Sequence, residues 1–411
     1  MSATAIEISE GLLAPAGRTT YERHLAVHGQ LPDCALHAET LLDEIELAKL
    51  VGRGGAAFPT ARKLAAVAGK RHAVVVANGT EGEPASRKDA VLMTRNPHLV
   101  LDGIVAAAEI VGAERAIVAV GREAHSAVAA ARSAVAERDD AVPVELALVP
   151  DRFVAGEETA LCAYLSGREA KPTGKEPRPS DKGVNGRPTL VQNVETLAQL
   201  ALLIRRGSRR FVATETTLAT ILGAVNRPGV VEIQADASLS AAIDAAGGFT
   251  ARPRAFLVGG YFGTWIGAAG NAFIPLTRAG LAPLGAAPGA RTVIALPETG
   301  CGLQETARIV RYLADESAGQ CGPCVFGLPA VADCLDAVVH GGSRAVSALR
   351  RIQALSSQIS GRGACRHPDG VLRLVASALT EFADDIQEHV ANTCRSTRRL
   401  DLPFSSSTDW R

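Results

Sequence analysis

The sequence predicts an α/β domain with a mostly parallel sheet, followed by a small β-grasp-like module and a C-terminal helical bundle. Between residues 47 and 207, short β-branched runs alternate with helical segments, a pattern typical of parallel α/β sheets. Residues 216–290 show the order strand, tight turn, strand, helix, strand. From residue 303 onward, apolar residues recur at helical spacing. The expected divisions are an N-terminal extension (1–45), domains at 46–210, 216–290 and 298–395, and a tail (396–411) whose end should be frayed.

In the first domain, three β-branched runs predict strands and two longer segments predict helices. The strands are expected at 72–78, 115–120 and 143–149, and the helices at 99–111 and 123–137. The segment 168–188 carries six cationic and three acidic side chains without apolar periodicity. Ordered loops of this length are uncommon unless they are functional, so we expect a role for this one.

The two remaining regions differ in their apolar patterns. Residues 217–225 and 230–234 should be strands joined by the turn Asn-Arg-Pro-Gly, followed by a helix at 239–246 and a strand at 254–260. The bundle is predicted from two apolar stripes with helical spacing. These are Val346, Leu349, Ile352, Leu355 and Ile359, and then Leu372, Val375, Leu379, Phe382, Ile386 and Val390.

Composition excludes several classes of function. The chain has 43 Lys plus Arg and 43 Asp plus Glu, which argues against electrostatic binding of nucleic acid or of an anionic membrane. Eight scattered cysteines suggest thiols and metal ligands in a cytoplasmic protein rather than a disulfide framework. The N-terminus lacks the pattern of an export signal, and no segment reads as a transmembrane helix. We therefore expect no direct membrane insertion.

A glycine-rich segment, residues 52–60, precedes an expected helix at 61–68. Small residues there would let backbone N–H groups reach a phosphate at the positive end of the helix. The segment lacks the third glycine and the preceding strand of the dinucleotide fingerprint. Taken alone, it is equally consistent with an anion site and with a simple tight turn.

Three further polar segments follow along the chain. Residues 78–84 come directly after a strand, which is where open α/β sheets hold ligands. Residues 156–159 begin a helix, so Glu157 and Glu158 are either site residues or partners of the helix dipole. Residues 192–196 are either part of a site or an amide-rich helix start. None of these segments is specific when it is considered alone.

Together, these four segments resemble the FMN- and NADH-binding subunit of NADH dehydrogenases (complex I) and of related NAD-linked hydrogenases and formate dehydrogenases. The family motifs read GRGGAGFPTGLKW, CNADExEPG, CGEETAL and GKPTTxNNVETL. The corresponding segments here are GRGGAAFPTARKL, ANGTEGEPA, AGEETAL and GRPTLVQNVETL. The resemblance covers nearly the whole chain, and it implies that the first domain binds FMN and that the module at 216–290 is the soluble-ligand-binding β-grasp (SLBB) domain.

The resemblance also implies which residues bind the cofactors. Phe58 would stack near the nicotinamide or adenine, and Lys175 would offer its charge to a phosphate. With Glu83 and Arg178, these two form the expected NAD(P)H-binding set. The expected cofactor-binding set is Gly52, Arg53, Gly54, Lys63, Asn78, Thr80, Glu81, Gly156, Glu157, Glu158, Gln192, Asn193 and Thr196.

Several positions depart from the family pattern. Thr80 replaces an aspartate and Gln192 an asparagine, and both can still form hydrogen bonds. Ala66 and Arg178 stand where the family has two aromatic residues that sandwich the adenine. Loss of two stacking faces weakens the inference of NADH binding. Arg178 is a candidate to bind a 2′-phosphate instead, which would favour NADPH.

A cysteine cluster lies in the helical region. Cys321 and Cys324 form a C-x-x-C pair, and Cys365 follows 41 residues later. Three such thiols can converge on one metal centre. In the family motif ESCGxCxPCR, these cysteines and one more hold a [4Fe–4S] cluster, but the first cysteine is Ala318 here. The open alternatives are a [4Fe–4S] cluster with water, His367 or Cys301 as fourth ligand, a [3Fe–4S] cluster, a zinc site, or no centre. The sequence assigns no role to Cys34, Cys162, Cys334 or Cys394.

Two functions are consistent with these residues. The first is an FMN-dependent NAD(P)H dehydrogenase that passes single electrons through an iron–sulfur centre to a ferredoxin-like protein or another subunit. The second is a homologue that has lost catalysis and serves as a scaffold or regulatory subunit. Electron flow in the opposite direction, from ferredoxin to NAD(P), is also open. We expect a cytoplasmic protein, either free or peripheral to a membrane complex.

Overall fold

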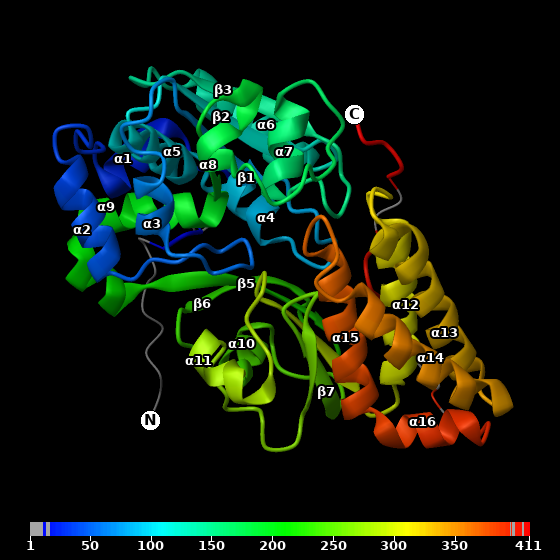
Figure 1. The fold of residues 1–411 in the computed structure, drawn as a ribbon. Helices are drawn as coiled ribbons and strands as arrows, with labels where there is room; N and C mark the ends of the chain where they lie inside the picture. Colours follow the sequence, from blue (N-terminus) through cyan, green and yellow to red (C-terminus); the bar gives the residue numbers. More distant parts are fainter. Residues whose placement is uncertain (1–10, 14–16, 395, 397–398, 405–406) are drawn as a thin grey trace, which may run out of the picture.

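The computed structural model describes residues 11–13, 17–394, 396, 399–404 and 407–411. Residues 1–10, which contributed to the expectation that no export signal is present, lie outside this set. An α/β domain built on a four-stranded sheet is followed by a five-stranded sheet and then by a group of C-terminal helices (Figure 1). The predicted fold class is confirmed.

The first sheet is parallel, with the strand order β3-β2-β1-β4. Strands β1 (Val74–Gly79), β2 (Arg115–Gly121) and β3 (Val144–Val149) lie where β-branched runs predicted them. Strand β4 (Thr189–Asn193) was not predicted, because its last residues read as the start of the helix that follows it. Pairing of β4 with β1 places Asn78 opposite Asn193 at the carboxyl ends of both strands.

Helices cover both faces of this sheet. One face packs on α4 (Lys88–Arg95), α5 (Pro97–Val111), α6 (His125–Ala136) and α9 (Val194–Thr214). The other packs on α7 (Glu158–Leu165), with the short α8 (Pro179–Lys182) and a 3-10 turn, η1 (Val184–Gly186), beside it. Helix α5 is buried along most of its length against α9, and Gly103 is required there because a Cβ would clash with the Leu197 carbonyl. The sheet edge is therefore held on a rigid base.

The N-terminal extension packs on this domain and on the second sheet. It contains α1 (Tyr21–His28) and α2 (Ala38–Leu47), and the glycine-rich segment then leads into α3 (Thr60–Ala65). The backbone N–H groups of Leu12 and Leu13 donate to the Glu232 carboxylate at 2.8 and 2.9 Å. Because Glu232 lies on the second sheet, the extension links the two regions.

The second sheet has five strands in the order β6-β5-β9-β7-β8. They are β5 (Thr216–Gly223), β6 (Gly229–Gln234), β7 (Pro253–Val258), β8 (Thr264–Gly267) and β9 (Thr292–Pro297), with α10 (Leu239–Ala245), α11 (Arg278–Leu281) and the 3-10 turn η2 (Ala282–Leu284). Strand β9 inserts between β5 and β7. The sheet therefore extends past residue 290, where we expected the module to end.

The C-terminal region is helical, as predicted. It comprises α12 (Gly302–Asp315), a π-helical turn η3 (Pro323–Gly327), α13 (Leu328–His340), α14 (Ser343–Ile359), α15 (His367–Glu381) and α16 (Ala383–Val390). Ile352, Ile359, Val375 and Phe382 from the two predicted stripes are buried, whereas Val346 is exposed at the start of α14. The stripes therefore identified the buried faces, apart from that one end.

The end of the chain is ordered, and the expectation that it is frayed is wrong for residues 407–411. The Trp410 ring lies 4.4 Å from the guanidinium carbon of Arg152, and the Trp410 carbonyl accepts from the Ala170 N–H at 2.9 Å. Asp409 pairs with Arg122 at 2.7 Å. Composition alone suggested a polar tail, but one tryptophan supplies enough apolar contact to hold it.

Buried contacts join the α/β domain to the other two regions. The Tyr261 N–H, just after β7, donates to the Glu83 carboxylate at 2.8 Å. Nε of Arg152 lies 3.2 Å from the Glu316 carboxylate, which follows α12, and the rings of Phe153 and Phe262 lie 4.7 Å apart. Residues near the carboxyl edge of the first sheet are therefore fixed to both neighbours.

One helical stretch among the described residues, Pro323–His340, is long and apolar enough to cross a membrane by those two criteria, although we expected no such segment. In the structure, 44% of it is buried, and α13 packs against α12 and α14. Core helices of globular proteins meet the same criteria, so the stretch is weak evidence for a membrane span.

Candidate functional site

The glycine-rich segment turns back on itself and is tied to helix α9. The Gly52 N–H donates to the Phe58 carbonyl, and the Thr60 N–H donates to the Leu50 carbonyl, both at 2.9 Å. The Arg53 N–H donates to the Thr196 hydroxyl, in the first turn of α9, at 2.8 Å. Thr196 therefore has a defined role, which is to hold the segment at the carboxyl edge of the sheet.

Two of the glycines, Gly52 and Gly54, could each carry a Cβ at ordinary contact distances. Neither Gly52 nor Gly54 has a positive φ. A Cβ at Gly54 would meet Asn193 at 3.4 Å, and a Cβ at Gly52 would meet backbone atoms at 3.6 Å or more, which are ordinary contact distances. The fold itself therefore does not require glycine at either position. A backbone without side chains at these two positions fits the close approach of a flat, phosphorylated ring system.

Asn78 and Gly156 join the ends of β1 and the turn before α7. Nδ2 of Asn78 donates to the Gly156 carbonyl, and its Oδ1 accepts from the Thr80 hydroxyl, both at 2.8 Å. A Cβ at Gly156 would clash with that hydroxyl, so glycine is required there. Thr80, which replaces the aspartate of the family pattern, therefore takes part in the hydrogen bonding of this turn.

The two glutamates before α7 have different surroundings. Glu157 caps the helix, because its carboxylate accepts from the Thr159 and Ala160 N–H groups at 3.0 Å. Glu158 pairs with Lys63 of α3 at 3.1 Å, and both side chains are partly exposed. The interpretation of Glu157 as a partner of the helix end is therefore correct. Glu158 and Lys63 lie side by side with charged groups accessible to a ligand.

Asn193 is the residue at which most segments of the site meet. Its Oδ1 accepts from the Glu195 N–H and so caps α9, while its Nδ2 donates to Asp89 at 2.7 Å and to the Asn78 carbonyl at 3.4 Å. Gln192 is buried and donates to the Thr60 hydroxyl at 3.2 Å. Through these contacts, the four polar segments from the sequence form one connected group.

A buried set of charges beneath Asn193 was missed from the sequence. Nζ of Lys88 lies 2.6 Å from Asp89 and 2.9 Å from Glu195, and all three residues are buried. Burial alone would lower the pKa of Lys88, but the adjacent carboxylates of Asp89 and Glu195 outweigh it and raise the pKa. Lys88 is therefore the cation of the set. Glu195 lies in one of the four polar segments but had no assigned role, and no periodicity marked Lys88.

Three residues predicted to bind cofactor turn their side chains to other partners. The Arg53 guanidinium donates to Gln199 at 3.0 Å and pairs with Glu215. The Glu81 carboxylate accepts from Ser86 and from the first N–H groups of α4. The side chains of Arg53 and Glu81 thus point away from the site and bind neighbouring elements. Only the backbone of these two residues is left to face a ligand.

Glu83 is the third such residue, and it lies at the contact with the second sheet. Its carboxylate accepts from the N–H groups of Tyr261 and Ala85. Burial raises the pKa of Glu83 to about 8 despite these bonds. Glu83 therefore braces the two regions, whereas the family resemblance assigned it to the dinucleotide.

The other residues of the expected nucleotide set lie on the surface. Phe58 is 46% exposed, and Lys175 is exposed in the 168–188 segment. The Arg178 guanidinium lies 3.6 Å from Glu176, with both side chains about two-thirds exposed. Among the described residues, no hydrogen bond or ion pair joins the side chain of Lys175 or Arg178 to the sheet edge. Their cationic groups are consequently open to solvent and to an anionic ligand.

The three predicted metal-binding cysteines lie in two loops of the helical region. Cys321 and Cys324 flank the start of η3, and Cys365 precedes α15. Burial raises the pKa of Cys324, and the Cys321 and Cys365 thiols raise it further. Among the described residues, these three thiols do not form a group whose ligand atoms all lie within 4.8 Å of one another. Burial also raises the pKa of Cys365. The His367 ring, two residues after Cys365, lies 5.6 Å from the Phe153 ring, so this loop packs beside the turn that precedes α7.

The candidates for a fourth ligand differ in their positions. Cys301 caps the N-terminal end of α12, whereas Cys321 follows the opposite end, and α12 spans about 20 Å. The suggestion of Cys301 as fourth ligand is therefore wrong. His367 follows Cys365 by two residues, and its Nε2 bonds to the Leu313 carbonyl at 2.7 Å. Its Nδ1 is buried without a hydrogen-bond partner, so an imidazole nitrogen is available near the thiols.

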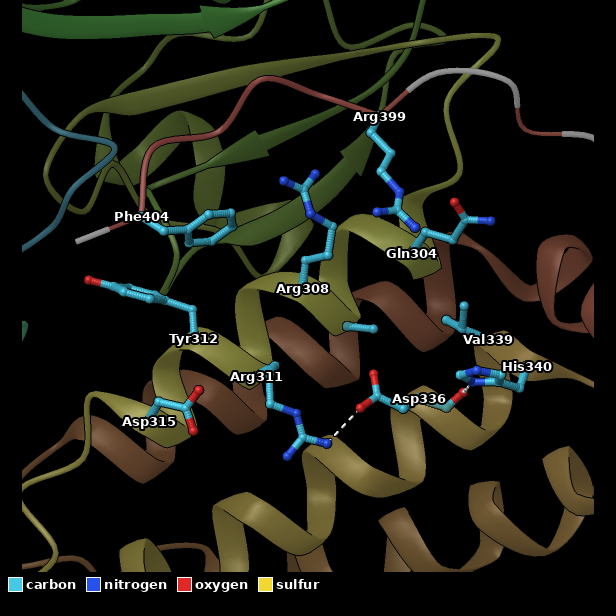
Figure 2. Close-up of a pocket in the computed structure, with 11 residues that line it drawn as sticks. Gln304, Arg308, Arg311, Tyr312, Asp315, Asp336, Val339, His340, Arg399 and Phe404 are labelled. Atoms are coloured by element: carbon cyan, nitrogen blue, oxygen red, sulfur yellow. Dashed lines mark hydrogen bonds and ion pairs between the residues drawn. The ribbon is translucent and has the colours of Figure 1, made fainter. Parts of the chain in front are cut away.

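A separate hollow of about 620 Å³ lies on the helical region, between α12, α13 and the tail (Figure 2). Arg308, Arg311 and Asp336 project toward it, and Arg311 pairs with Asp336 across it at 2.6 Å. None of the residues predicted to bind a cofactor lines this hollow. It is therefore distinct from the site at the sheet edge.

Comparison with known proteins agrees with this arrangement. Residues 45–202 match the family model of the Nuo51 FMN-binding domain, 218–260 that of the SLBB domain, and 304–389 that of the NADH-ubiquinone oxidoreductase-F iron–sulfur binding region. The chain thus carries an FMN-binding domain and an iron–sulfur binding region.

Individual relatives match over most of the chain. The F-type NADH-quinone oxidoreductase subunit of Mycobacterium tuberculosis (strain H37Rv) is 30% identical over 404 residues, 90% of each chain. That of Streptomyces coelicolor is 29% identical over 413 residues, 95% of this chain and 90% of its own. A crystal structure of an NAD+-reducing [NiFe]-hydrogenase in the H2-reduced state superposes with a TM-score of 0.78 at 26% identity, covering 91% of this chain and 67% of the other.

Proposed function

Since the chain belongs to the family of F-type NADH-quinone oxidoreductase subunits, we propose that it takes a hydride from NADH or NADPH onto FMN and passes single electrons through an iron–sulfur centre. The acceptor would be a ferredoxin-like protein or another subunit. The observation that carries the proposal is the connected group at the sheet edge. In this group Asn193 donates to the Asn78 carbonyl and lies next to the backbone of Gly54. We place the protein in the cytoplasm, free or peripheral to a membrane complex.

The residues of this group would bind and orient the flavin. Bound FMN supplies a hydride acceptor that can release electrons one at a time. The backbone at 52–54 would approach the ring and its phosphate, and Thr196 would keep that backbone in place. Lys63 offers a charge beside Glu158. No protein acid or base is needed for transfer between stacked rings, so position is the main contribution of the chain.

The cysteines would hold the electron-accepting centre. Three thiols at Cys321, Cys324 and Cys365 suit a [3Fe–4S] cluster, or a [4Fe–4S] cluster whose fourth ligand is water or His367. The 5.6 Å contact between the rings of His367, two residues after Cys365, and Phe153, three residues before Gly156, supports transfer from the flavin site. Val325 and Phe326, directly after Cys324, are 43% and 76% exposed. Exposed apolar side chains beside the centre suit docking of a partner protein.

The proposal is tested by an anaerobic titration of the purified protein with NADH and, separately, with NADPH. Flavin bleaching and iron–sulfur signals are followed together, after iron and acid-labile sulfide have been counted. We expect bleaching by one nucleotide, followed by reduction of a centre that disappears in Cys324→Ala. The variant Cys334→Ala, which changes a buried cysteine of α13, is the matched control and should keep the centre. Flavin bleaching in a protein that contains no iron or sulfide would reject the iron–sulfur centre but not the flavin part of the proposal.

The second candidate function, a scaffold or regulatory subunit without catalysis, is favoured by Ala318 at a ligand position and by the two missing aromatic residues. The two candidate functions differ in whether the purified protein contains flavin. A scaffold that has lost the flavin would be colourless after purification and would bind no added FMN. A yellow protein that is bleached by neither nucleotide nor dithionite-reduced ferredoxin would also favour the scaffold.

The preference between the two nucleotides depends on the exposed Arg178. If its guanidinium binds a 2′-phosphate, Arg178→Ala should lower kcat/KM for NADPH about 10- to 100-fold, the usual effect of losing a charged hydrogen bond, and leave NADH unaffected. Lys182→Ala, in the same segment, is the control. Equal use of both nucleotides that is unchanged in Arg178→Ala would remove this part of the proposal.

A further inference from the structure

A second group of potential metal ligands lies at the base of the helical region. It consists of Cys301, His389 and Cys394, whose ligand atoms all lie within 4.8 Å of one another. Sγ of Cys301 is 3.2 Å from Nε2 of His389. Cys301 and His389 are buried, and Cys394 is partly buried. Three segments meet here: the start of α12, the end of α16 and the residues between α16 and the tail.

This group is separate from the predicted iron–sulfur ligands. Cys301 precedes α12 and Cys321 follows it, so the length of that helix, about 20 Å, lies between them. A single cluster cannot include both sets. The sequence assigned no role to Cys394 or His389, because 88 residues separate Cys301 from His389 and only the fold brings them together.

We propose that Cys301, His389 and Cys394 bind one zinc ion that fastens the residues between α16 and the tail to α12 and α16. Two thiolates and an imidazole are the preferred donors of a structural zinc site. Tetrahedral zinc keeps its ligand atoms about 3.5 to 3.8 Å apart, given bonds of about 2.1 and 2.3 Å. In the structure the Cys301–His389 pair is 3.2 Å apart and all three ligand atoms lie within 4.8 Å of one another, so side-chain movements of about 1 Å would bring them to these distances.

Asp385 lies next to this group on α16, although its carboxylate is outside the set of ligand atoms that lie within 4.8 Å of one another. It lies one helical turn before His389 on α16, so both side chains are on the same face. Its Oδ1 pairs with Arg254, while its buried Oδ2 has no hydrogen-bond partner. The carboxylate would have to move toward the zinc to become its fourth ligand, and Arg254 would balance the remaining negative charge.

Gln304 supports the two thiols from the first turn of α12. Its backbone N–H donates to Sγ of Cys301 at 3.4 Å, and its Nε2 lies 3.9 Å from Sγ of Cys394. Donors of this kind stabilise the thiolate form that binds metal. Gln304 also lines the hollow of Figure 2 beside Arg399. The proposed zinc site and one wall of that hollow therefore share a residue.

The zinc ion would fix where the tail leaves α16. Beyond Cys394, the described part of the tail returns along α12, where the Leu400 N–H donates to Glu305 at 2.8 Å. The Tyr261 hydroxyl then donates to the Pro403 carbonyl at 2.6 Å, and Trp410 reaches the α/β domain. The tail thus contacts all three regions. A zinc ion bound just before it would fix the position from which it starts.

The test is the zinc content of the full-length protein, expressed with zinc and purified anaerobically without chelators. We expect about one zinc per chain, and a fall to under about a tenth in Cys301→Ser and in Cys394→Ser. Cys334→Ser and Cys324→Ala should keep the zinc, which separates this site from the iron–sulfur ligands. Because Cys394 is only partly buried, Cys394→Ser should fold and keep its flavin. Cobalt added to the zinc-free protein should give a thiolate-to-metal absorption band.

Two results would overturn the proposal. One is a protein without zinc that shows no cobalt–thiolate band, in which Cys301 and His389 form only a hydrogen bond. The other is a Cys301–Cys394 disulfide in the anaerobically purified protein, detected by mass spectrometry. Chelator treatment gives an independent readout. It should lower the melting temperature of the wild type and of Cys334→Ser but not that of Cys301→Ser.

Discussion

Nζ of Lys88 lies 2.9 Å from Oε2 of Glu195, and both side chains are fully buried beneath the ends of β1 and β4. Lys88 also contacts Asp89, whose second oxygen accepts from Asn193. The position of Asn193, where the polar segments meet, is therefore set by a cation that never reaches the surface. Replacing that cation should affect both the stability of the fold and the shape of the site.

The first prediction concerns this buried pair. Lys88→Met should lower the free energy of unfolding by about 3 to 5 kcal/mol, because Asp89 and Glu195 would remain buried without a counter-charge. Adding Glu195→Gln should restore part of the loss. Lys70→Met, which breaks a partly exposed pair with Asp181, is the control and should cost less than about 1 kcal/mol. Urea unfolding measures all four proteins, and equal losses for Lys70 and Lys88 would contradict the argument.

The second prediction separates flavin binding from folding. Gly54→Ala should keep the wild-type melting temperature without flavin, because the added Cβ meets only Asn193 at 3.4 Å. It should weaken FMN binding about 10- to 100-fold, since the methyl group would occupy space reserved for the ring. Gly156→Ala is the contrasting variant: its Cβ clashes with Thr80, so it should lose stability as well. Fluorescence titration of the apoprotein with FMN measures the affinity, and unchanged binding by Gly54→Ala would place the flavin elsewhere.

The third prediction is a pH dependence from Glu83. Burial raises its pKa from 4.5 to about 8 in the folded protein. Between these values the native state holds a proton that the unfolded state has lost, so this group makes stability fall as pH rises, and the effect levels off above pH 8. The slope is at most about 1.4 kcal/mol per pH unit. Glu83→Gln should be flatter than the wild type over that window, whereas the exposed Glu298→Gln should keep the wild-type profile in denaturant unfolding at several pH values.

The sequence predicted those parts of the fold that depend on local patterns. Strands β1, β2 and β3 are β-branched runs, and the helices of the C-terminal region have apolar residues at helical spacing. Strands β4 and β9 were missed because each is defined by a partner distant in the chain. Strand β4 also merges with the start of α9, so its amide residues look helical in isolation.

The site was predictable to a similar extent. Four glycine-bearing segments were identified from residue type and position, and the structure brings them together at Asn193. Side-chain direction was not predictable. Arg53 turns away from the site to pair with Glu215, and Glu81 turns away to accept hydrogen bonds from the start of α4. Likewise, the contact of Trp410 with Arg152 depends on the path of the whole tail.

The last prediction concerns that tail and the segment it holds. The Trp410 carbonyl accepts from the Ala170 N–H, and its ring covers Arg152 and Lys171. Ala170 lies near the start of the 168–188 segment, which carries Lys175 and Arg178. Trp410→Ala removes two cation–π contacts, each worth about 0.5 to 2 kcal/mol, so the end of the tail should detach while the domains stay folded.

Detachment should loosen the 168–188 segment without disturbing the sheet edge. We therefore expect faster hydrogen exchange at the Ala170 amide and a several-fold higher KM for NAD(P)H in Trp410→Ala, with the flavin content unchanged. Thr408→Ala alters an exposed neighbour in the tail and should behave like the wild type. If exchange at Ala170 accelerates while KM does not move, the segment is ordered independently of the tail, and its cationic residues do not depend on that order to bind the nucleotide.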